Sequence, residues 1–470
     1  MNLVQALRLV RMDANVFEEP PCLALVGAGG KTTALFQIGR QLPGPVILTA
    51  TTHLAVHQAS LADHHIIARN PGDLEGLEFP PLAKVMLVTG SRVEEARLSG
   101  VQAPILDWLK RFTEENQIPL LIEADGSRQR PVKAPGENEP ALPSFVRQVC
   151  TVAGLSALGK PLNEEWVHRP EKFAALSGIE PGSAITVDGL VQVLNSPEGG
   201  LKNIPAGARR IALLTQVDTD ERRLDAGRLS RLLLPSYDAI LAVSLQPAGA
   251  KKYREKPEKS SFPVILPEPV VTSVHEPVAG ILLAAGGSSR MGRPKQLLPW
   301  NGEPMVRYVA LKALAAGLSP VLVVTGAFHE QVSRAVADLP VTLIHNQEWE
   351  SGQSSSLRAG LMRLPGETGS SLFLLVDQPQ VPVDLMRSLI ALHAETLAPV
   401  VAPRVGEKRA NPVLFDRQTF SDLTSIQGDV GGRALFSRYP VAWLDWPDEN
   451  LLLDIDTEED YHSLRNAPLL

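Results

Sequence analysis

Residues 280–295 read GILLAAGGSSRMGRPK, and this stretch decides the fold of the C-terminal part of the chain. It begins with a short apolar run, of the kind that forms a buried parallel strand. Small residues at 286–289 then expose backbone N–H groups and let a phosphate come close. Three positive side chains follow: Arg290, Arg293 and Lys295. This order predicts a phosphate-binding loop, although the glycine pair alone would also fit an ordinary turn between a strand and a helix.

The chain beyond this loop alternates apolar strands with helical segments, which predicts a mostly parallel α/β sheet. Strands are expected at 321–326 and 341–344, and a helix at 304–316. The apolar run 372–376 is a further buried strand, and it ends at Asp377. A carboxylate at such a strand end, opposite a phosphate loop, is the expected Mg²⁺ ligand. The alternative is an aspartate that only caps the following loop.

Together these features resemble the molybdenum cofactor cytidylyltransferase family of nucleotidyltransferases, over about residues 278–465. The resemblance rests on the loop at 283–295 and on four later motifs: Asp-Gln-Pro at 377–379, Arg-Ala-Asn-Pro at 409–412, Gly-Asp-x-Gly-x-Arg at 428–433 and Asp-x-Asp-Thr at 454–457. It implies a Rossmann-like nucleotidyltransferase domain with a mostly parallel sheet, which uses Mg²⁺ and takes CTP as its substrate.

The resemblance also implies roles for single residues. The implied catalytic residues are Arg290, Lys295 and Asp377. The nucleotide would lie on Ala284, Ala285, Gly286, Gly287, Ser288 and Ser289. Asp377 and Asp456 would hold the metal. The acceptor would contact Arg409, Asn411 and Asp429. Ser355 is a further acceptor-binding candidate from its own chemistry, because the hydroxyls of its serine-rich segment could hold a ribose or phosphate, although they would equally serve to cap a helix.

The implied reaction moves CMP from CTP to the terminal phosphate of molybdopterin cofactor, with release of pyrophosphate, for the maturation of molybdenum hydroxylases. A phosphate nucleophile is already ionised at neutral pH, so the protein needs no general base. Catalysis would then come from positioning and charge neutralisation. Two alternatives stay open: another phosphorylated acceptor, such as a sugar phosphate, or a nucleotide-gated chaperone that delivers the cofactor to an apo molybdenum hydroxylase.

A second glycine loop lies near the N-terminus. The apolar run 23–26 leads into GAGGKTT at 27–33, and a helical pattern continues to Leu42. A strand, a glycine loop, Lys-Thr and a helix form the arrangement of a P-loop, which holds phosphate on backbone N–H groups and on the lysine. Its nucleotide-binding residues would be Gly27, Gly29, Gly30, Lys31, Thr32 and Thr33. The short G-x-x-G-K-T-T spacing resembles the ATP loop of Mur-type ligases.

An apolar strand at 119–122 ends in Glu123-Ala-Asp125. Acids at a strand end next to a phosphate loop are typical of a Mg²⁺ position, so Thr32 and Asp125 are the candidate metal ligands of this half. Its nucleotide could be ATP or GTP. A further strand at 211–214 leads into TQVD at 215–218, which is similar to the [NT]-K-x-D turn that reads guanine in GTPases, with Gln216 in place of lysine. Because of that departure, base recognition and an ordinary turn stay equally open.

Four segments of this half resemble YqeC, a family described as an accessory protein of selenium-dependent hydroxylases. They are the loop at 27–33, EADGS at 123–127, GKPL at 159–162 and HRPE at 168–171, and the resemblance covers about residues 15–245. The role of that family is poorly defined, so the resemblance fixes neither what the nucleotide drives nor any selenium chemistry.

Composition sets the remaining limits. The 470 residues are too many for one core, and 44% hydrophobic with 21% charged residues is typical of a globular protein. The net charge of −7 argues against a nucleic-acid partner. The two cysteines form no disulfide framework, which fits the cytoplasm. Residues 1–11 read as an amphipathic helix and not a signal peptide, and no apolar run reaches the ~18 residues of a membrane span.

Proline density predicts the domain boundary. Five prolines fall between 257 and 277, where they disfavour helices and central strands, so this segment is expected to be a linker. The predicted domains are therefore a P-loop-type α/β domain at 1–256, the linker at 257–277 and a nucleotidyltransferase domain at 278–470.

Overall fold

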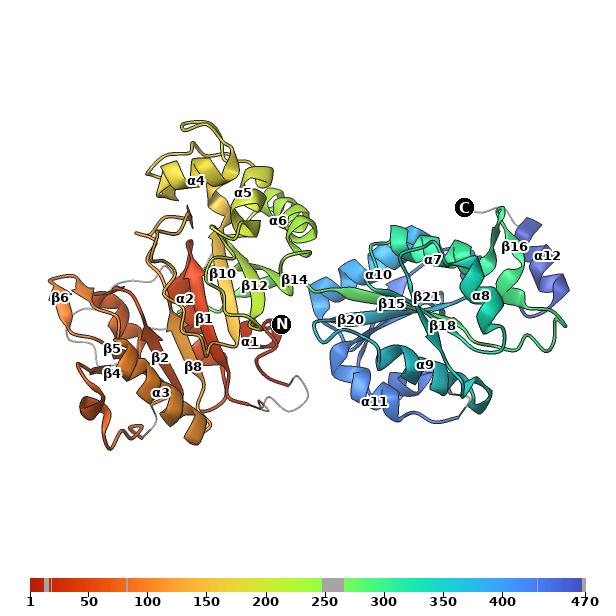
Figure 1. The fold of residues 1–470 in the computed structure, drawn as a ribbon, viewed down its shortest axis with the longest axis horizontal. Coiled ribbons are helices and arrows are strands. Elements are labelled where there is room, and N and C mark those ends of the chain that lie inside the picture. Colours follow the sequence, from red (N-terminus) through yellow and green to blue (C-terminus); the bar gives the residue numbers. More distant parts are fainter. Residues whose placement is uncertain (12–16, 18, 82, 247–265, 429, 467–470) are drawn as a thin grey trace. The chain divides into compact units, whose positions relative to one another are not determined.

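The structure is a computed structural model, and it describes all residues except 12–16, 18, 82, 247–265, 429 and 467–470. The chain divides into two compact units, Met1–His275 and Glu276–Leu470. Each unit is a mostly parallel sheet with helices packed against it, so the predicted α/β class is confirmed (Figure 1). Within the described residues, every helix is too short or too polar to cross a bilayer.

The first unit contains a nine-stranded sheet in the order β14-β13-β12-β10-β1-β8-β2-β5-β4. All neighbours run parallel except β13 and β14, which are antiparallel. The strands are β1 (Cys22–Gly27), β2 (Val46–Ala50), β4 (His64–Ile67), β5 (Val85–Thr89), β8 (Leu120–Glu123), β10 (Gln148–Gly154), β12 (Arg209–Thr215), β13 (Ala239–Ser244) and β14 (Val270–His275). The glycine loop leaves the central strand, β1, so its neighbours on both sides end beside it.

Helices cover both faces of this sheet because its strands are apolar on both sides. The helices are α1 (Leu3–Ala6), α2 (Lys31–Gln41), α3 (Ala103–Glu115), α4 (Pro170–Ser177), α5 (Val187–Asn195) and α6 (Asp220–Leu233). One core joins β12 and β13 to α5 and α6, and another joins β1, β5 and β8 to α3. Short strands complete the unit: β3 (Leu54–Ala55), β6 (Arg92–Glu94), β7 (Arg97–Leu98), β9 (Val132–Lys133) and β11 (Val167–His168).

Two expectations about the first unit are corrected. The amphipathic helix predicted for 1–11 is a four-residue helix, α1, because the chain leaves helical geometry at Arg8, whose φ is +58°. Its Leu3 and Leu7 are fully buried. The predicted linker at 257–277 includes β14, which pairs antiparallel with β13 along the edge of the sheet. Residues 257–265 lie outside the described residues.

The second unit contains an eight-stranded sheet in the order β19-β18-β15-β20-β23-β21-β22, with β24 paired to β21. Its strands are β15 (Val278–Ala284), β18 (Val321–Thr325), β19 (Thr342–His345), β20 (Ser370–Leu375), β21 (Val400–Val405), β22 (Lys408–Arg409), β23 (Val413–Asp416) and β24 (Val441–Asp445). β15, β18, β19 and β20 are parallel, while β23 runs antiparallel between β20 and β21. The loop predicted to bind phosphate, at 283–295, therefore follows an interior strand, β15, whose parallel neighbours β18 and β20 end at the same edge of the sheet.

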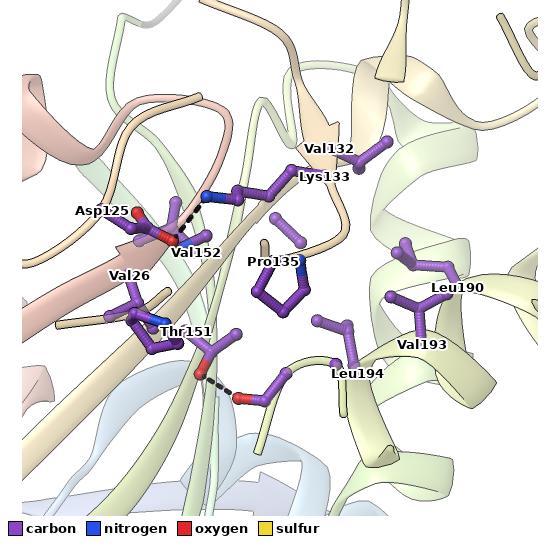
Figure 2. A pocket seen from close by; sticks show the side chains of 15 residues that line it. Val26, Asp125, Val132, Lys133, Pro135, Thr151, Val152, Leu190, Val193 and Leu194 are labelled. Atoms are coloured by element: carbon purple, nitrogen blue, oxygen red, sulfur yellow. Dashed lines mark hydrogen bonds and ion pairs between the residues drawn. The ribbon is translucent and has the colours of Figure 1, made fainter. Parts of the chain in front are cut away.

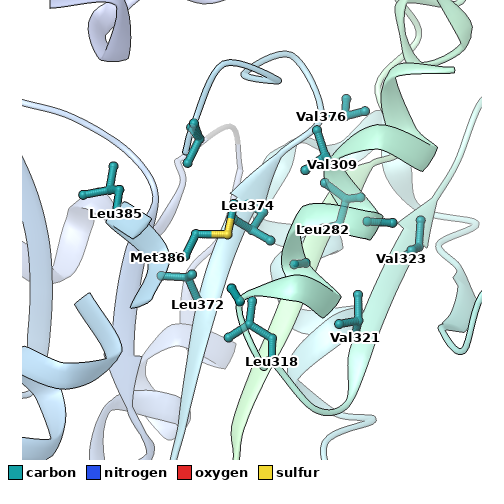
Figure 3. Close-up of a cluster of buried hydrophobic side chains, with 14 of the residues drawn as sticks. Leu282, Val309, Leu318, Val321, Val323, Leu372, Leu374, Val376, Leu385 and Met386 are labelled. Atoms are coloured by element: carbon teal, nitrogen blue, oxygen red, sulfur yellow. The ribbon is translucent and has the colours of Figure 1, made fainter. Parts of the chain in front are cut away.

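The central strands of this unit are mostly apolar because each of their faces meets its own core. Leu282, Leu372 and Leu374 point to one side, where they meet Met386 of α10 (Figure 3). Ile281, Leu283 and Phe373 belong to the core on the opposite side. The helices are α7 (Met305–Ala315), α8 (His329–Ala335), α9 (Gln353–Leu361), α10 (Val383–Thr396), α11 (Phe420–Ser425) and α12 (Glu458–Asn466), with a small hairpin of β16 (Pro299–Trp300) and β17 (Glu303–Pro304).

The position of β14 predicts where the chain can be cut. A fragment of residues 276–470 should unfold in one cooperative transition, because its sheet and cores lie within that range. A fragment of residues 1–275 should melt at least about 5 °C above one of residues 1–269, since the longer fragment keeps the buried side chain of Val274 and the pairing of β13. Thermal melts by circular dichroism test both points. Equal melting temperatures for the two N-terminal fragments would show that β14 adds nothing to the first unit.

Candidate functional site

In the second unit, adjacent strand ends bring the predicted residues together. β15 and β20 are parallel neighbours with Leu283 opposite Leu375, so the loop after β15 and Asp377 lie at one edge of the sheet. Lys295 Nζ donates to Asp377 Oδ2 across 2.6 Å. The same ammonium lies 3.2 Å from Asp456 Oδ1, and Arg290 Nη1 lies 2.6 Å from Asp456 Oδ2. The sequence-predicted catalytic and metal-ligating residues of this half thus form one connected cluster.

The charge of Lys295 is stabilised by this cluster. Burial by itself would lower the pKa of Lys295, but the carboxylates of Asp377 and Asp456 outweigh burial and raise that pKa above its usual value. A backbone hydrogen bond also joins the two segments that carry these carboxylates, because Ile455 N donates to Asp377 O across 3.0 Å. The closing Asp-x-Asp segment is thereby fixed against the end of β20.

Two residues that the sequence analysis did not single out complete the cluster. Gln296 is fully buried, and its amide nitrogen donates to the carbonyls of Gly286 and Ala284 at 2.6 and 3.3 Å, while its oxygen accepts from Ser288 Oγ at 3.2 Å. Gln296 therefore fixes the conformation of the glycine loop. A polar residue directly after Lys295 in an otherwise apolar segment was the available signal.

The second such residue is Asp454, which accepts from Gln378 Nε2 at 2.7 Å. Burial, followed by the nearby charge of Asp377, raises the pKa of Asp454 above its usual value. The described residues contain no group of three His, Cys, Asp or Glu side chains close enough to enclose a metal ion. Asp377 and Asp456 nevertheless suit Mg²⁺, which usually takes one or two carboxylates and completes its shell with water and phosphate oxygens.

The other residues expected on the nucleotide loop lie along one short path. Ala284 and Ala285 are buried at the end of β15, whereas Gly286 and Ser289 are exposed. Gly287 lies against Trp349, where a Cβ would come within about 3.1 Å of the indole ring. Ser288 has a φ of +51° and accepts from the Lys295 backbone N–H at 3.1 Å. The loop is thus held open toward solvent by contacts beneath it.

The predicted acceptor residues are spread over three elements. Ser355 is buried in α9, where it accepts from Asn346 Nδ2 and donates to Gly352 O, both at 2.8 Å. The Arg409 guanidinium lies 4.4 Å from the ring centroid of Phe436. Asn411 precedes β23, which runs antiparallel beside β20, so Asn411 lies toward the edge that carries Asp377. Asp429 lies outside the described residues.

The glycine loop of the first unit joins β1 to α2. Gly27, Gly29 and Gly30 have φ values of +91°, +92° and +123°, which favour glycine. A Cβ on Gly29 would also lie 2.6 Å from the carbonyl oxygen of Pro131. Lys31, Thr32 and Thr33 form the first turn of α2, so the backbone N–H groups of a helix start are placed at the loop, as an anion site requires.

Lys31 is buried among carboxylates from the adjacent strand. Its Nζ donates to Gly27 O at 2.7 Å and lies 3.2 Å from Asp125 Oδ1 and 3.9 Å from Glu123 Oε1. Only 3% of the Lys31 side chain and 2% of the Asp125 side chain are exposed. Asp125 Oδ2 in turn accepts from Gly27 N and from Lys133 Nζ, both at 2.9 Å. The strand ends of β1 and β8 are therefore locked together by charge.

Glu123 is a further residue of this site that the sequence analysis placed only as a neighbour of Asp125. Its Oε2 accepts from Thr32 Oγ1 at 2.7 Å, so the threonine predicted as a metal ligand contacts Glu123. Burial raises the pKa of Glu123, and Lys31 and Thr32 oppose that shift. The oxygen donors available to a cation here are thus Thr32, Glu123 and Asp125.

Further ion pairs and a small cavity adjoin this cluster. Lys133 also lies 2.8 Å from Glu139 Oε2, and Arg169 binds both oxygens of Glu139 at 2.8 and 2.9 Å. Burial would raise the pKa of Glu139, but these partners lower it to about 2.

A cavity of about 30 Å³ lies next to Asp125 and Lys133, with Leu190, Leu194 and other apolar side chains across from them (Figure 2). That volume suits about one water molecule.

Two family matches divide the chain as its two units do. Residues 280–442 match the MobA-like NTP transferase domain, and residues 23–171 match the YqeC protein family. The second match ends at Glu171, beyond the loop and the buried carboxylates just described.

Individual relatives agree with this division. YqeC of Escherichia coli K12, an uncharacterized protein, is 30% identical over 52% of this chain and 95% of its own length. Nicotine blue oxidoreductase of Paenarthrobacter nicotinovorans is 32% identical over 40% of this chain and 96% of its own length. Molybdenum cofactor cytidylyltransferase of Escherichia coli K12 is 23% identical over 38% of this chain and 92% of its own length.

Among solved structures, Rv0371c from Mycobacterium tuberculosis H37Rv is 29% identical, covers 41% of this chain and 98% of its own, and has a TM-score of 0.38. The two family matches and the near-complete coverage of the sequence relatives identify both halves. The chain belongs to the YqeC family through its N-terminal unit and to the MobA-like NTP transferases through its C-terminal unit.

Proposed function

We propose that the C-terminal unit transfers CMP from CTP to the terminal phosphate of molybdopterin cofactor and releases pyrophosphate. The observation that carries this proposal is the contact of Lys295 with both Asp377 and Asp456 at the ends of β15 and β20. This geometry places a cation and two carboxylates beside a glycine loop, which is what a metal-bound triphosphate requires. The relative named molybdenum cofactor cytidylyltransferase supports the choice of nucleotide and acceptor.

The residues of this chain would act mainly through charge. Asp377 and Asp456 would hold Mg²⁺, which would supply positive charge to neutralise the phosphates. Lys295 would then exchange its carboxylate partners for phosphate oxygens, and Arg290, 73% exposed, has room to turn toward the departing pyrophosphate. The acceptor phosphate attacks the α-phosphorus, the bond from that phosphorus to the bridging oxygen breaks, and that oxygen leaves on pyrophosphate.

We further propose that the N-terminal unit binds a purine nucleoside triphosphate on residues 27–33, with its metal on Thr32, Glu123 and Asp125. The supporting observation is that Lys31 lies at the start of α2 and faces Asp125 of the neighbouring strand end. A phosphate would replace the carboxylates as the partner of Lys31, and a divalent cation would take up the carboxylate charge. This unit would thereby gate or assist delivery of the product to an apo molybdenum hydroxylase in the cytoplasm.

The direct test of the main proposal is pyrophosphate release by the full chain with Mg²⁺, molybdopterin cofactor and each triphosphate in turn. CTP should give the fastest release, and the product should be the cytosine dinucleotide form of the cofactor. Release with a sugar phosphate but not with molybdopterin cofactor would assign another acceptor. Oxidation or reduction of nicotine blue, without pyrophosphate release, would favour the activity named for that relative.

Replacing Asp377 by asparagine tests the role of its charge. The variant should fold normally, because Asp377 keeps 20% of its side chain exposed and contributes little to the core. Loss of one preorganised electrostatic contact typically lowers the rate ~10²–10³-fold, so pyrophosphate release at saturating Mg²⁺ should fall by about that factor. The matched control is Asp338→Asn, which removes an exposed charge paired with Arg307 and should leave turnover unchanged. More than about a third of wild-type turnover in Asp377→Asn would exclude Asp377 as the metal ligand.

Replacing Lys31 by alanine tests the N-terminal site. The change should lower triphosphate affinity at this unit at least ~10-fold, because hydrogen bonds to charged groups are worth about 1.5–3 kcal/mol, while transfer by the C-terminal unit persists. Calorimetry with Mg²⁺ and ATP or GTP measures the affinity, and Lys172→Ala, at an exposed position of α4, is the control. Because Lys31 is buried beside carboxylates, a melting curve must show that the variant is folded, and Thr32→Ala gives a second measurement of the same site. Unchanged affinity in both variants would remove this proposal.

A further inference from the structure

We infer that the nucleotide of the N-terminal unit is a guanine nucleotide and that Asp218 reads its base. This inference rests on the proposed nucleotide site at residues 27–33 and adds the identity of the base. It comes from the place of the TQVD turn, residues 215–218, in the sheet and from the contacts that join this turn to the glycine loop.

The positions of Glu123 and Asp125 indicate on which side of the glycine loop the base would lie. Glu123 and Asp125 follow β8, which is the neighbour of β1 on one side. Glu123 and Asp125 would hold the divalent cation that neutralises the outer phosphates, so we expect these phosphates to lie toward β8. The α-phosphate and the nucleoside then extend to the other side of β1. On that side the sheet continues as β10, β12 and β13, all parallel to β1. The base would therefore lie against the carboxyl ends of these strands.

The turn after β12 is attached directly to the glycine loop. Thr215 is fully buried, and its hydroxyl donates to Gly29 O across 2.5 Å. Gln216 has a φ of +62°, and its side-chain oxygen accepts from Ser156 Oγ after the end of β10 at 2.5 Å. Gln216 therefore fixes the neighbouring strand end, and recognition of the base edge does not depend on it. The next residues of the turn, Val217 and Asp218, continue beside this anchored segment.

The end of β13 reaches the same place from its other side. A Cβ on Gly30 would lie 2.8 Å from Leu245 Cδ1, so the segment after β13 packs on the loop. Gln37 of α2 donates to Leu245 O at 2.8 Å and holds this segment against the helix that begins at Lys31. The ends of β12 and β13 are therefore fixed relative to the residues that would hold phosphate.

Asp218 lies between these two strand ends with its carboxylate oriented. Ser244, the last residue of β13, donates its hydroxyl to Asp218 Oδ1. The other oxygen, Oδ2, is 3.8 Å from Arg222 Nη1, which is too long for a hydrogen bond. The Asp218 side chain keeps 32% of its surface exposed. A carboxylate that Ser244 orients, that is partly exposed and that has only a long ion pair on its second oxygen is suited to bind a ligand that offers two adjacent donors.

Guanine offers such a pair, and the other common bases do not. An ionised carboxylate only accepts hydrogen bonds, and its two oxygens match two parallel N–H donors. The N1–H and the 2-amino group of guanine form that pair, whereas adenine presents one donor and one acceptor on the equivalent edge. Sites built to hydrogen-bond a substrate group reject the analogue without it by up to ~10⁴–10⁵-fold, and the partial exposure of Asp218 lowers the expected preference to at least about 100-fold.

The experiment uses the full chain and fluorescent GDP displaced by GDP, ADP, CDP or xanthosine diphosphate. The part of the signal that Lys31→Ala abolishes belongs to the N-terminal unit. In the wild type, GDP should compete for that part at least about 100-fold better than ADP. In Asp218→Asn, xanthosine diphosphate should become the better competitor. Xanthine has a carbonyl where guanine has its 2-amino group, and the asparagine amide can donate to that carbonyl while its oxygen accepts from N1–H.

The Asp218→Asn variant also separates recognition from structure. If Asp218 only tied β12 to β13, the amide oxygen of the variant would still accept from Ser244, so the variant would fold and the base preference would stay unchanged. The control Asp220→Asn removes a carboxylate that is 93% exposed and should change nothing. If Lys31→Ala abolished no part of the fluorescent GDP signal seen with the wild type, the proposed nucleotide site itself would be overturned. A Lys31-dependent signal in which ADP competes as well as GDP, or in which Asp218→Asn gains no affinity for xanthosine diphosphate, would overturn only the guanine assignment.

Discussion

The candidate sites of both units depend on one interaction, the pairing of a lysine after a central strand with a carboxylate at the end of the next parallel strand. Lys295 and Asp377 make this pair across β15 and β20, and Lys31 and Asp125 make it across β1 and β8. Each pair joins two adjacent strand ends at the edge of the sheet where a glycine loop lies. Strands that are apolar on both faces can place such charges only at their ends, where the chain leaves the core.

The two pairs differ in their exposure to water, and this difference sets what each can do. The side chains of Lys295 and Asp377 are 14% and 20% exposed, whereas those of Lys31 and Asp125 are 3% and 2% exposed. A buried ion pair repays its loss of hydration only when its charges stay balanced. A triphosphate alone would upset that balance in the N-terminal unit, because it adds negative charge beside Glu123 and Asp125. In the proposed site, entry of the nucleotide together with a divalent cation would preserve this balance.

The proximity of the central residues in both candidate sites could be predicted from the sequence, because strand ends in a parallel sheet lie at one edge whatever their separation in the chain. Lys295, Asp377 and Asp456 were predicted together and lie together. Gln296 was missed because its role depends on the carbonyls that the loop turns inward, which no spacing reveals. β14 was taken for linker because prolines surround it, although pairing with β13 outweighs that local signal.

The order of the strands, which the sequence does not show, changes the meaning of the TQVD turn. Along the chain, Thr215 is far from Gly29, and a substitution of lysine by glutamine in the motif weakens its interpretation. In the sheet, only β10 separates β12 from β1, and the Thr215 hydroxyl bonds to the glycine loop itself. The β8 side of the loop carries the acids, and the β12 side carries the oriented and partly exposed carboxylate of Asp218. A nucleotide has a phosphate end that takes a metal and a base end that forms hydrogen bonds, so a loop flanked in this way would distinguish the two directions of the proposed nucleotide.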